Sequence, residues 1–175
     1  AAVAAQRRGA RGARAACGGA AAREVGAAML VWADGQSGTV GGGALEWQAV
    51  CRARDLLAVG GTRLDREALG PKLGQCCGGA VTLLTEVFTA DAVAALDDQV
   101  IARAVDGREM PLGVKRLLAA QRGQGVLPPV QMVQGWFIEP VARPMRHLWI
   151  WGAGHVGRAL VAVLAGPALV DSWRC

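Results

Sequence analysis

The sequence contains no tyrosine and only two serines, Ser37 and Ser172. A catalyst that depends on a tyrosine phenol is therefore excluded, and a serine hydrolase has almost no serine to activate. Lysine is also scarce, at Lys72 and Lys115, while arginine, alanine and glycine are abundant. This usage is typical of a GC-rich coding sequence, so the arginine excess does not by itself indicate a function.

The five cysteines are odd in number and are never spaced as C-x-x-C. This pattern argues against a disulfide scaffold and against a zinc knuckle. A reducing, cytoplasmic location is therefore the default prediction. The longest uncharged run, residues 123–138, contains two prolines and three glutamines. It is shorter than the roughly 20 apolar residues that a transmembrane helix needs, so we expect no membrane partner.

The net charge of +5 comes entirely from the N-terminal segment, because five arginines precede the first acidic residue, Glu24. Basic and acidic residues balance beyond that point, so we expect no basic face for nucleic acid. Residues 1–23 have few large apolar side chains and are predicted to be a disordered or aberrant tail. A transit peptide is the alternative interpretation, although such peptides are rich in serine and this segment has none.

The sequence pattern of residues 24–120 predicts an N-terminal α+β domain. An apolar run at 27–33 is followed by Asp34-Gly35, a preferred two-residue hairpin turn, and by a second run at 37–40. A helix at 44–58 is expected to end at Gly60-Gly61. The alternation at 80–88 predicts a strand with one apolar face, and the stripe at 91–105 predicts a helix capped by Asp91. A weaker helix is expected at 112–120.

Residues 121–146 are predicted to be a linker with one short strand at 135–141, because the segment contains two glycines and Pro128-Pro129. Residues 147–175 predict the start of a Rossmann-like domain, with a strand at 147–151, a helix at 158–165 and a strand at 168–171. The chain as a whole is therefore expected to be an α/β protein in which an α+β domain precedes the first β-α-β unit of an incomplete Rossmann-like domain.

The turn of that unit reads G-A-G-H-V-G. Gly152 would make the tight turn, Gly154 would let backbone amides approach a pyrophosphate, and Gly157 would allow close packing of helix and strand. Asp171 follows at the position of a ribose-binding acid. A dinucleotide is therefore a possible ligand, and the alternative is a doubly wound domain that binds no nucleotide.

Two further glycine-rich segments are candidate sites. Successive amides at Gly41–Gly43, just before a helix, can form an anion-binding nest, although a plain tight turn is the preferred interpretation because glycine is plentiful in this chain. The segment from Gln75 to Gly79 reads QCCGG. The paired thiolates of Cys76 and Cys77 suit a soft or redox-active metal centre or reversible sulfur chemistry, and the alternative is two buried small hydrophobic residues.

In order along the chain, REVGAAMLVWADGQSGTVGGGALEWQAV, LGQCCGGAVTLLTEVF, GWFIEPV and LWIWGAGHVGRAL resemble the xanthine dehydrogenase accessory proteins of the XdhC/CoxI family. The resemblance implies a chaperone rather than an enzyme. Such a chaperone binds and protects the molybdenum cofactor, assists its sulfuration by a cysteine desulfurase, and inserts it into a xanthine dehydrogenase-type apoenzyme. It also implies a Rossmann-like second domain, a homodimer when the protein is intact, and an ordered N-terminal strand and helix where this chain has its arginine-rich tail.

Carried over to this sequence, the resemblance places Cys76 and Cys77 near the molybdenum, with Gln75, Gly78 and Gly79 as their frame. It makes Gly41–Gly43 a seat for a phosphate or a pterin edge. It also assigns Gly152, Gly154, Gly157 and Asp171 to the Rossmann-like turn and strand. The chain is expected to be truncated where further strands follow in the family. The alternative functions are an NAD(P)-dependent oxidoreductase and a non-functional gene fragment.

Overall fold

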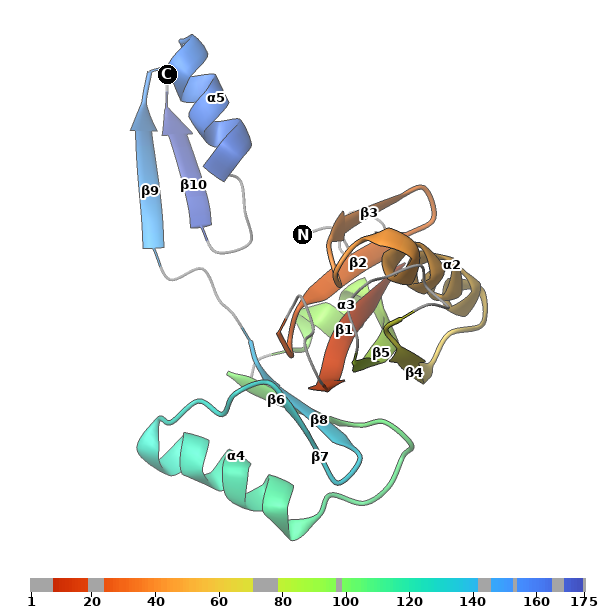
Figure 1. The fold of residues 1–175 in the computed structure, drawn as a ribbon. Helices are drawn as coiled ribbons and strands as arrows, with labels where there is room; N and C mark the ends of the chain where they lie inside the picture. The colour runs from red at the N-terminus through yellow and green to blue at the C-terminus, as the bar shows by residue number, and fades with distance from the viewer. Residues whose placement is uncertain are drawn as a thin grey trace. The chain divides into compact units, whose positions relative to one another are not determined.

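The computed structural model describes residues 8–18, 24–70, 79–96, 99–141, 146–152, 154–164 and 169–174. The chain divides into two compact units, Ala1–Pro140 and Val141–Cys175. Figure 1 shows the elements of each unit. The unit boundary falls after residue 140, so the expected linker at 121–146 is wrong for the residues before that boundary.

The first unit is built on a five-stranded antiparallel sheet with the order β3-β2-β1-β5-β4. Its strands are β1 (Arg8–Gly18), β2 (Ala28–Trp32), β3 (Gly35–Gly38), β4 (Thr62–Ala68) and β5 (Ala80–Thr89). Residue Gly12 of β1 lies opposite Met29 of β2 and Thr85 of β5. The central position therefore belongs to β1.

The expectation of a disordered tail is wrong for residues 8–18, because this segment forms β1. Its alanines at positions 10, 13 and 15 are at most 2% exposed. Gly12 leaves room for the Met29 side chain, which lies 3.5 Å from where a Cβ would stand. A strand enclosed on both faces can consist of small residues when its neighbours supply the large apolar side chains. The low hydrophobic volume of this segment therefore led to the prediction of a tail where the structure has a central strand.

One face of the sheet is covered by α2 (Gly43–Val59), which lies beside the sheet in Figure 1. The helix ends as expected at Gly60, whose N–H donates to the Leu56 carbonyl oxygen. Helix and sheet share one buried apolar cluster, whose members include Ala10, Met29, Val31, Val40, Leu45, Ala49, Val50, Ala53, Leu69, Val81 and Leu83. The strand expected at 80–88 is confirmed, and its odd-numbered residues Val81, Leu83 and Val87 pack in this cluster.

The other face of the sheet packs on a three-stranded antiparallel sheet with the order β6-β8-β7. These strands are β6 (Val100–Ala104), β7 (Gln131–Val133) and β8 (Trp136–Pro140). Phe137 is fully buried with Ala13, Ala15 and Leu84 between the two sheets. The helix α4 (Leu112–Gln124) then packs on the small sheet through a cluster that contains Val100, Val114 and Ile138.

The helix expected at 91–105 is wrong, because α3 covers only Ala90–Ala94 and β6 begins at Val100. Thr89, rather than Asp91, is the N-cap, and its hydroxyl accepts a hydrogen bond from the Ala92 N–H at 3.2 Å. The apolar stripe of this segment fits a helix and a strand alike. Pairing with β8 decides between them, because the tertiary partner outweighs a local pattern that fits both structures.

Two hairpin turns of the structure differ from what the sequence predicts. In the β2–β3 hairpin, Trp32 lies opposite Gly35, so the turn residues are Ala33 and Asp34. A Cβ on Gly35 would stand 2.8 Å from the Trp32 ring, so the glycine is needed for this contact rather than for a positive φ. The unpredicted β7–β8 hairpin turns at Gln134 and Gly135, whose φ angles of 49° and 82° are typical of a two-residue turn.

A four-residue ion cluster joins the two sheets. Glu139 accepts hydrogen bonds from Arg11 at 2.5 and 3.0 Å and from Arg103 at 2.5 Å. Arg103 also donates to both carboxylate oxygens of Glu86, at 2.7 and 2.8 Å. Burial lowers the pKa of Arg103, but the two carboxylates outweigh it and raise the pKa overall. Arg103 is therefore protonated, and the four side chains link β1 and β5 to β6 and β8.

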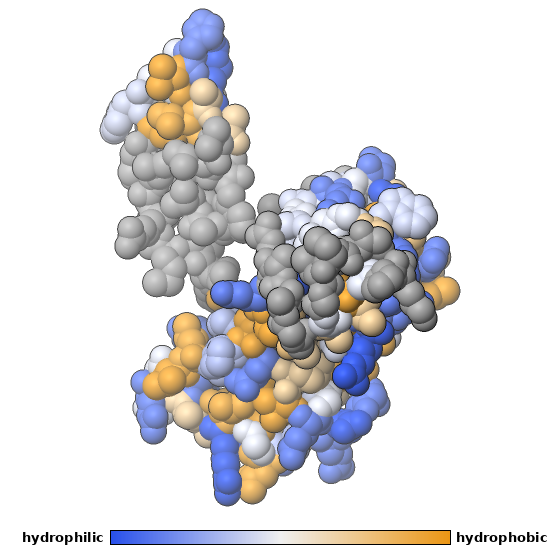
Figure 2. Space-filling model, in the orientation of Figure 1, coloured by the Kyte–Doolittle hydropathy of each residue, from blue (hydrophilic) through white to orange (hydrophobic). Residues whose placement is uncertain are grey.

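The second unit is a β-α-β arrangement of β9 (Arg146–Trp151), α5 (His155–Leu164) and β10 (Leu169–Arg174). The two strands pair in parallel, as expected for the first step of a doubly wound fold. Within this unit Trp151, Val156 and Leu160 are exposed, and Figure 2 shows hydrophobic residues at its surface. Among the described helices of the chain, none is long and apolar enough to span a membrane.

Replacing Glu139 with Ala should lower the free energy of unfolding of the first unit by about 3 kcal/mol, because two part-buried guanidinium groups lose their shared acceptor. Chemical denaturation measures this change. The control is Asp106→Ala, which removes the exposed Asp106–Arg108 pair and should leave the midpoint unchanged. Equal effects of the two substitutions would contradict a structural role for the cluster.

Candidate functional site

Two of the predicted motifs follow strands that end at the same end of the five-stranded sheet. Strands β1, β3 and β4 run in one direction, since each pairs antiparallel with β2 or β5. Their carboxyl ends therefore meet at one end of the sheet. Gly41–Gly43 comes shortly after β3, and the QCCGG motif lies in the connection from β4 to β5. The fold thus brings the glycine turn and the ends of the cysteine segment to the same side.

The cysteine segment itself lies outside the described residues, which stop at Gly70 and resume at Gly79. Gln75, Cys76, Cys77 and Gly78 are therefore predicted site residues on which the structure gives no geometry. Both flanks are described. The Leu69 N–H donates to the Gly79 carbonyl oxygen at 2.8 Å, which closes the β4–β5 connection at its base.

The glycine turn is filled by a carboxylate of the chain itself. Oε2 of Glu46 accepts hydrogen bonds from the N–H groups of Val40 and Gly42, both at 3.1 Å, and from the Thr39 hydroxyl. The φ angles of Gly42 and Gly43, 77° and 63°, allow the turn to wrap around this oxygen. The turn thus holds a carboxylate of the chain through the amides of Val40 and Gly42, and binding of a ligand at Gly41–Gly43 stays a prediction.

Sequence reasoning missed Glu46, although the signal was available. The residue stands four positions after Gly42, so its side chain reaches back over the first turn of α2. Burial raises the pKa of Glu46, but hydrogen bonds from Thr39, Gly42, Val40 and Gln36 outweigh burial and lower it overall. The carboxylate is therefore ionised at neutral pH and also favours the positive end of the helix dipole.

Arg14 connects β1 to the glycine turn. The side chain is 2% exposed, and its Nε donates to the Val40 carbonyl oxygen at 2.6 Å. A Cβ on Gly41 would stand 2.5 Å from Nη2, so the turn can lie over the guanidinium only because residue 41 is glycine. Nη1 lies 3.8 Å from the Cys17 sulfur. A buried cation therefore underlies the sheet end that carries both motifs.

Leu69 completes the connection between the two motifs. It is buried in the same cluster as Val40 and Leu45, which lie on either side of the glycine turn. The first flank of the cysteine segment thus belongs to the packing unit that holds the turn. We define the sheet-end site as Arg14, the turn Gly41–Gly43 with Glu46, and the flanks Leu69 and Gly79.

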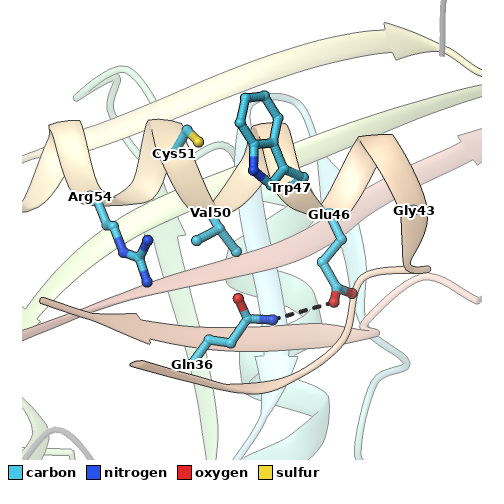
Figure 3. Close-up of a pocket in the computed structure, with 7 residues that line it drawn as sticks. All are labelled: Gln36, Gly43, Glu46, Trp47, Val50, Cys51 and Arg54. Carbon is cyan, nitrogen blue, oxygen red and sulfur yellow. Dashed lines mark hydrogen bonds between the residues drawn. The ribbon is translucent and has the colours of Figure 1, made fainter. Parts of the chain in front are cut away.

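A hollow of about 290 Å³ lies next to this site, along α2 and β3. Figure 3 shows Gln36 from β3 below the helix, with Glu46, Val50 and Arg54 projecting toward it and Trp47 on the other edge. The Gln36 side-chain N–H donates to Oε1 of Glu46 at 3.3 Å. One carboxylate oxygen of Glu46 therefore faces the glycine turn, and the other faces Gln36.

The turn of the second unit has the geometry that its glycines predict. Gly152 has a φ of +104°, and a Cβ on Gly157 would stand 2.5 Å from the Gly152 carbonyl oxygen. A Cβ on Gly154 would meet no atom within 4 Å. Asp171 lies inside β10, opposite Leu148, because the strand continues to Arg174 rather than ending at residue 171 as expected. Contact of these residues with a nucleotide stays a prediction.

No cluster of three or more His, Cys, Asp or Glu side chains able to hold a metal ion occurs in the part of the chain that the structure describes. Cys76 and Cys77 fall outside that part.

The fold and the sheet-end site define a mixed α/β protein with a glycine turn and a cysteine-bearing connection on one sheet. The family model described as the XdhC and CoxI family matches residues 3–67. That segment of the chain is similar to this family. The matched segment contains β1, so the arginine-rich strand lies inside the matched segment, and the expected departure of this chain from the family at β1 is wrong.

A solved structure is also similar to this chain, namely a crystal structure described as a xanthine dehydrogenase from Bacillus halodurans at 2.80 Å resolution. The TM-score is 0.56 at 18% sequence identity, and the match covers 94% of this chain and 58% of that chain. The likeness confirms the mixed α/β fold. Because the match covers 58% of that chain, this chain spans less than two thirds of its length. No curated protein sequence matches the chain.

Replacing Glu46 with Ala should cost about 1 kcal/mol of stability, because it leaves two turn amides without an acceptor. The folded-state pKa of Glu46 is lowered, so its contribution is present above the unfolded pKa of about 4.3 and is lost as the pH falls below it. Denaturation of both proteins between about pH 3 and pH 6 tests this. The difference should shrink toward acid, whereas a constant difference would contradict the assignment. Glu109→Ala serves as an exposed control.

Proposed function

We propose that this chain binds a molybdenum-containing pterin cofactor as cargo and delivers it to a xanthine dehydrogenase-type apoenzyme in the cytoplasm, acting as a chaperone rather than as an enzyme. The match of residues 3–67 to the XdhC and CoxI family model supports an accessory role. The description of the similar Bacillus structure supports the link to xanthine dehydrogenase. The observation that carries the proposal is the meeting of the glycine turn and both flanks of the cysteine segment at one sheet end.

The chemistry of the cysteine segment fits a soft metal. Cα atoms of adjacent residues are about 3.8 Å apart, which is below the usual disulfide range, so Cys76 and Cys77 favour two separate thiols. Thiolates are preferred ligands of soft metal centres and can take part in sulfur exchange. We therefore assign contact with the metal end of the cargo to Cys76 and Cys77. Gln75, Gly78 and Gly79 would form the frame around them.

The glycine turn has a different role in this proposal from the one that the sequence predicts. Glu46 already accepts hydrogen bonds from the amides of Val40 and Gly42. A phosphate at Gly41–Gly43 would have to displace this carboxylate or lie beside a like charge, which is unfavourable. We therefore assign the turn a positioning role, in which it orients the start of α2 and the Leu69 flank.

Sulfuration of the cargo by a cysteine desulfurase and formation of a homodimer stay predictions that come from the family resemblance. Both are compatible with a carrier that exposes its cargo at a sheet end. Neither is needed for the binding step, which can be tested on this chain alone.

The double substitution Cys76→Ala and Cys77→Ala should lower the molybdenum and pterin recovered with the anaerobically purified chain by about tenfold or more, because it removes both thiolates that are assigned to the metal. Elemental analysis and pterin fluorescence measure the two parts of the cargo. Cys175→Ala, in the second unit, is the matched thiol control. Unchanged molybdenum occupancy and unchanged activation of the apoenzyme by the double variant would contradict the role of the thiols.

Dinucleotide binding at the β9–α5 turn is a second candidate, favoured by the close approach of Gly157 to the Gly152 carbonyl oxygen. This contact and the positive φ of Gly152 are the backbone requirements of a phosphate-binding turn at a helix N-terminus. An NAD(P)-dependent oxidoreductase would use such a turn, with Asp171 on the ribose.

Gly154→Val is the substitution that tests this candidate, because a Cβ at Gly154 meets nothing in the protein itself. If a pyrophosphate lies against this backbone, titration with NADH or NADPH should show saturable binding that the variant loses. Absence of saturable binding by the unmodified chain would refute the candidate. Equal affinity of chain and variant would also refute it.

A further inference from the structure

The hollow along α2 and β3 contains groups that neither the sheet-end site nor the β9–α5 turn uses. Trp47, Val50 and Arg54 are three and four positions apart on the helix and so share one face. Gln36 and Glu46 lie beside them, as Figure 3 shows. Along the helix the order is a carboxylate, an indole ring, an apolar floor and a guanidinium group.

Trp47 offers a flat surface to solvent. Its side chain is 70% exposed. The residues one helical turn away on either side are Gly43 and Cys51, so no large side chain of the same helix face covers the ring. An exposed indole is a stacking platform for another flat ring. Val50, which is buried, supplies an apolar floor beside it.

Arg54 provides an uncompensated positive charge at one end of the hollow. It has no ion pair or hydrogen bond within the described residues, whereas Arg52 in the same helix is paired with Glu67. A free guanidinium binds phosphate or carboxylate in a bidentate manner. With a rise of 1.5 Å per residue, the Arg54 backbone lies roughly 10 Å along the helix from Trp47.

Glu46 and Gln36 provide hydrogen-bond acceptors at the other end. Oε2 of Glu46 serves the glycine turn, while Oε1 accepts the Gln36 side-chain N–H at 3.3 Å. A carboxylate oxygen can accept more than one hydrogen bond, and the Gln36 carbonyl oxygen is an acceptor as well. This end of the hollow is therefore suited to a ligand edge that carries neighbouring N–H donors.

We propose that this hollow binds a flat fused-ring heterocycle with adjacent N–H donors at one edge and an anionic group at the opposite end. The donors would face Glu46 and Gln36, the ring would lie against Trp47 and Val50, and the anion would pair with Arg54. The 2-amino-4-oxopyrimidine edge of pterins and of guanine has this donor pattern. The inference rests on the proposed function for its choice of a pterin, since a pterin is the organic part of the proposed cargo.

The test is a calorimetric titration of the full chain with three probes: pterin-6-carboxylate, guanosine monophosphate (GMP) and adenosine monophosphate (AMP). The first two should bind, and AMP should bind at least about tenfold more weakly, because adenine lacks the paired donors at that edge. Trp47→Ala should weaken pterin-6-carboxylate about tenfold through lost stacking. Trp47→Phe, which keeps a flat ring, should restore most of the affinity.

Arg54→Gln should weaken the same probe by about tenfold and should reduce the salt dependence of its binding. Arg66→Gln is the matched control, because Arg66 is an exposed arginine on β4 away from the hollow. Since Trp47 and Arg54 are exposed, all variants should give the circular dichroism spectrum of the unmodified chain.

Equal binding of AMP and pterin-6-carboxylate would overturn the assigned donor edge. Unchanged affinity in Trp47→Ala or in Arg54→Gln would overturn the assigned site. If GMP binds about tenfold more tightly than pterin-6-carboxylate, the proposed class of ligand is supported, but the hollow is then assigned to guanine nucleotides. The Cys76→Ala, Cys77→Ala variant should bind pterin-6-carboxylate normally, so failure of the proposed function and failure of this inference are distinguishable.

Discussion

Two arginines of β1 point to opposite faces of the five-stranded sheet and hold the adjoining layers against it. Arg14 donates to the Val40 carbonyl oxygen under the glycine turn, on the face covered by α2. Arg11 pairs with Glu139 of the small sheet on the other face. Their separation by three positions puts them on opposite sides of a strand. The position of both motifs relative to the core depends on these two contacts.

The small residues of β1 make this arrangement possible. A strand of alanine and glycine leaves room for Met29 and Phe137, which come from its neighbours on the two faces. A specific acceptor offsets the desolvation cost of each guanidinium group, a main-chain carbonyl for the buried Arg14 and a carboxylate for the part-buried Arg11.

Elements with strong local signals could be predicted from the sequence. Helix α2 has an apolar face and a glycine at its end, β5 alternates regularly, and the β9–α5–β10 unit follows from three glycines and two apolar runs. Elements defined by distant partners could not. In β1 the hydrophobic volume is supplied by other strands, and β6 depends on pairing with β8, so neither segment carries its own pattern.

The candidate site likewise combines features that the sequence predicts with features that depend on the fold. The glycine turn was predictable, and so was its attraction for an anion, but the identity of that anion depends on how Glu46 folds back along α2. The hollow could not be predicted, because Gln36 belongs to a hairpin whose position beside α2 is set by the whole sheet. The cysteine pair was identified by its composition alone, and the fold adds the position of its flanks, Leu69 and Gly79.

The central claim is that β1 lies in the middle of the sheet and thereby brings the glycine turn and the cysteine flanks together. Amide hydrogen exchange of residues 8–18 tests it most directly. The account predicts that these amides exchange as slowly as those of β5, with which they form a ladder. Exchange at the rate of an unstructured peptide, while β5 stays protected, would contradict it.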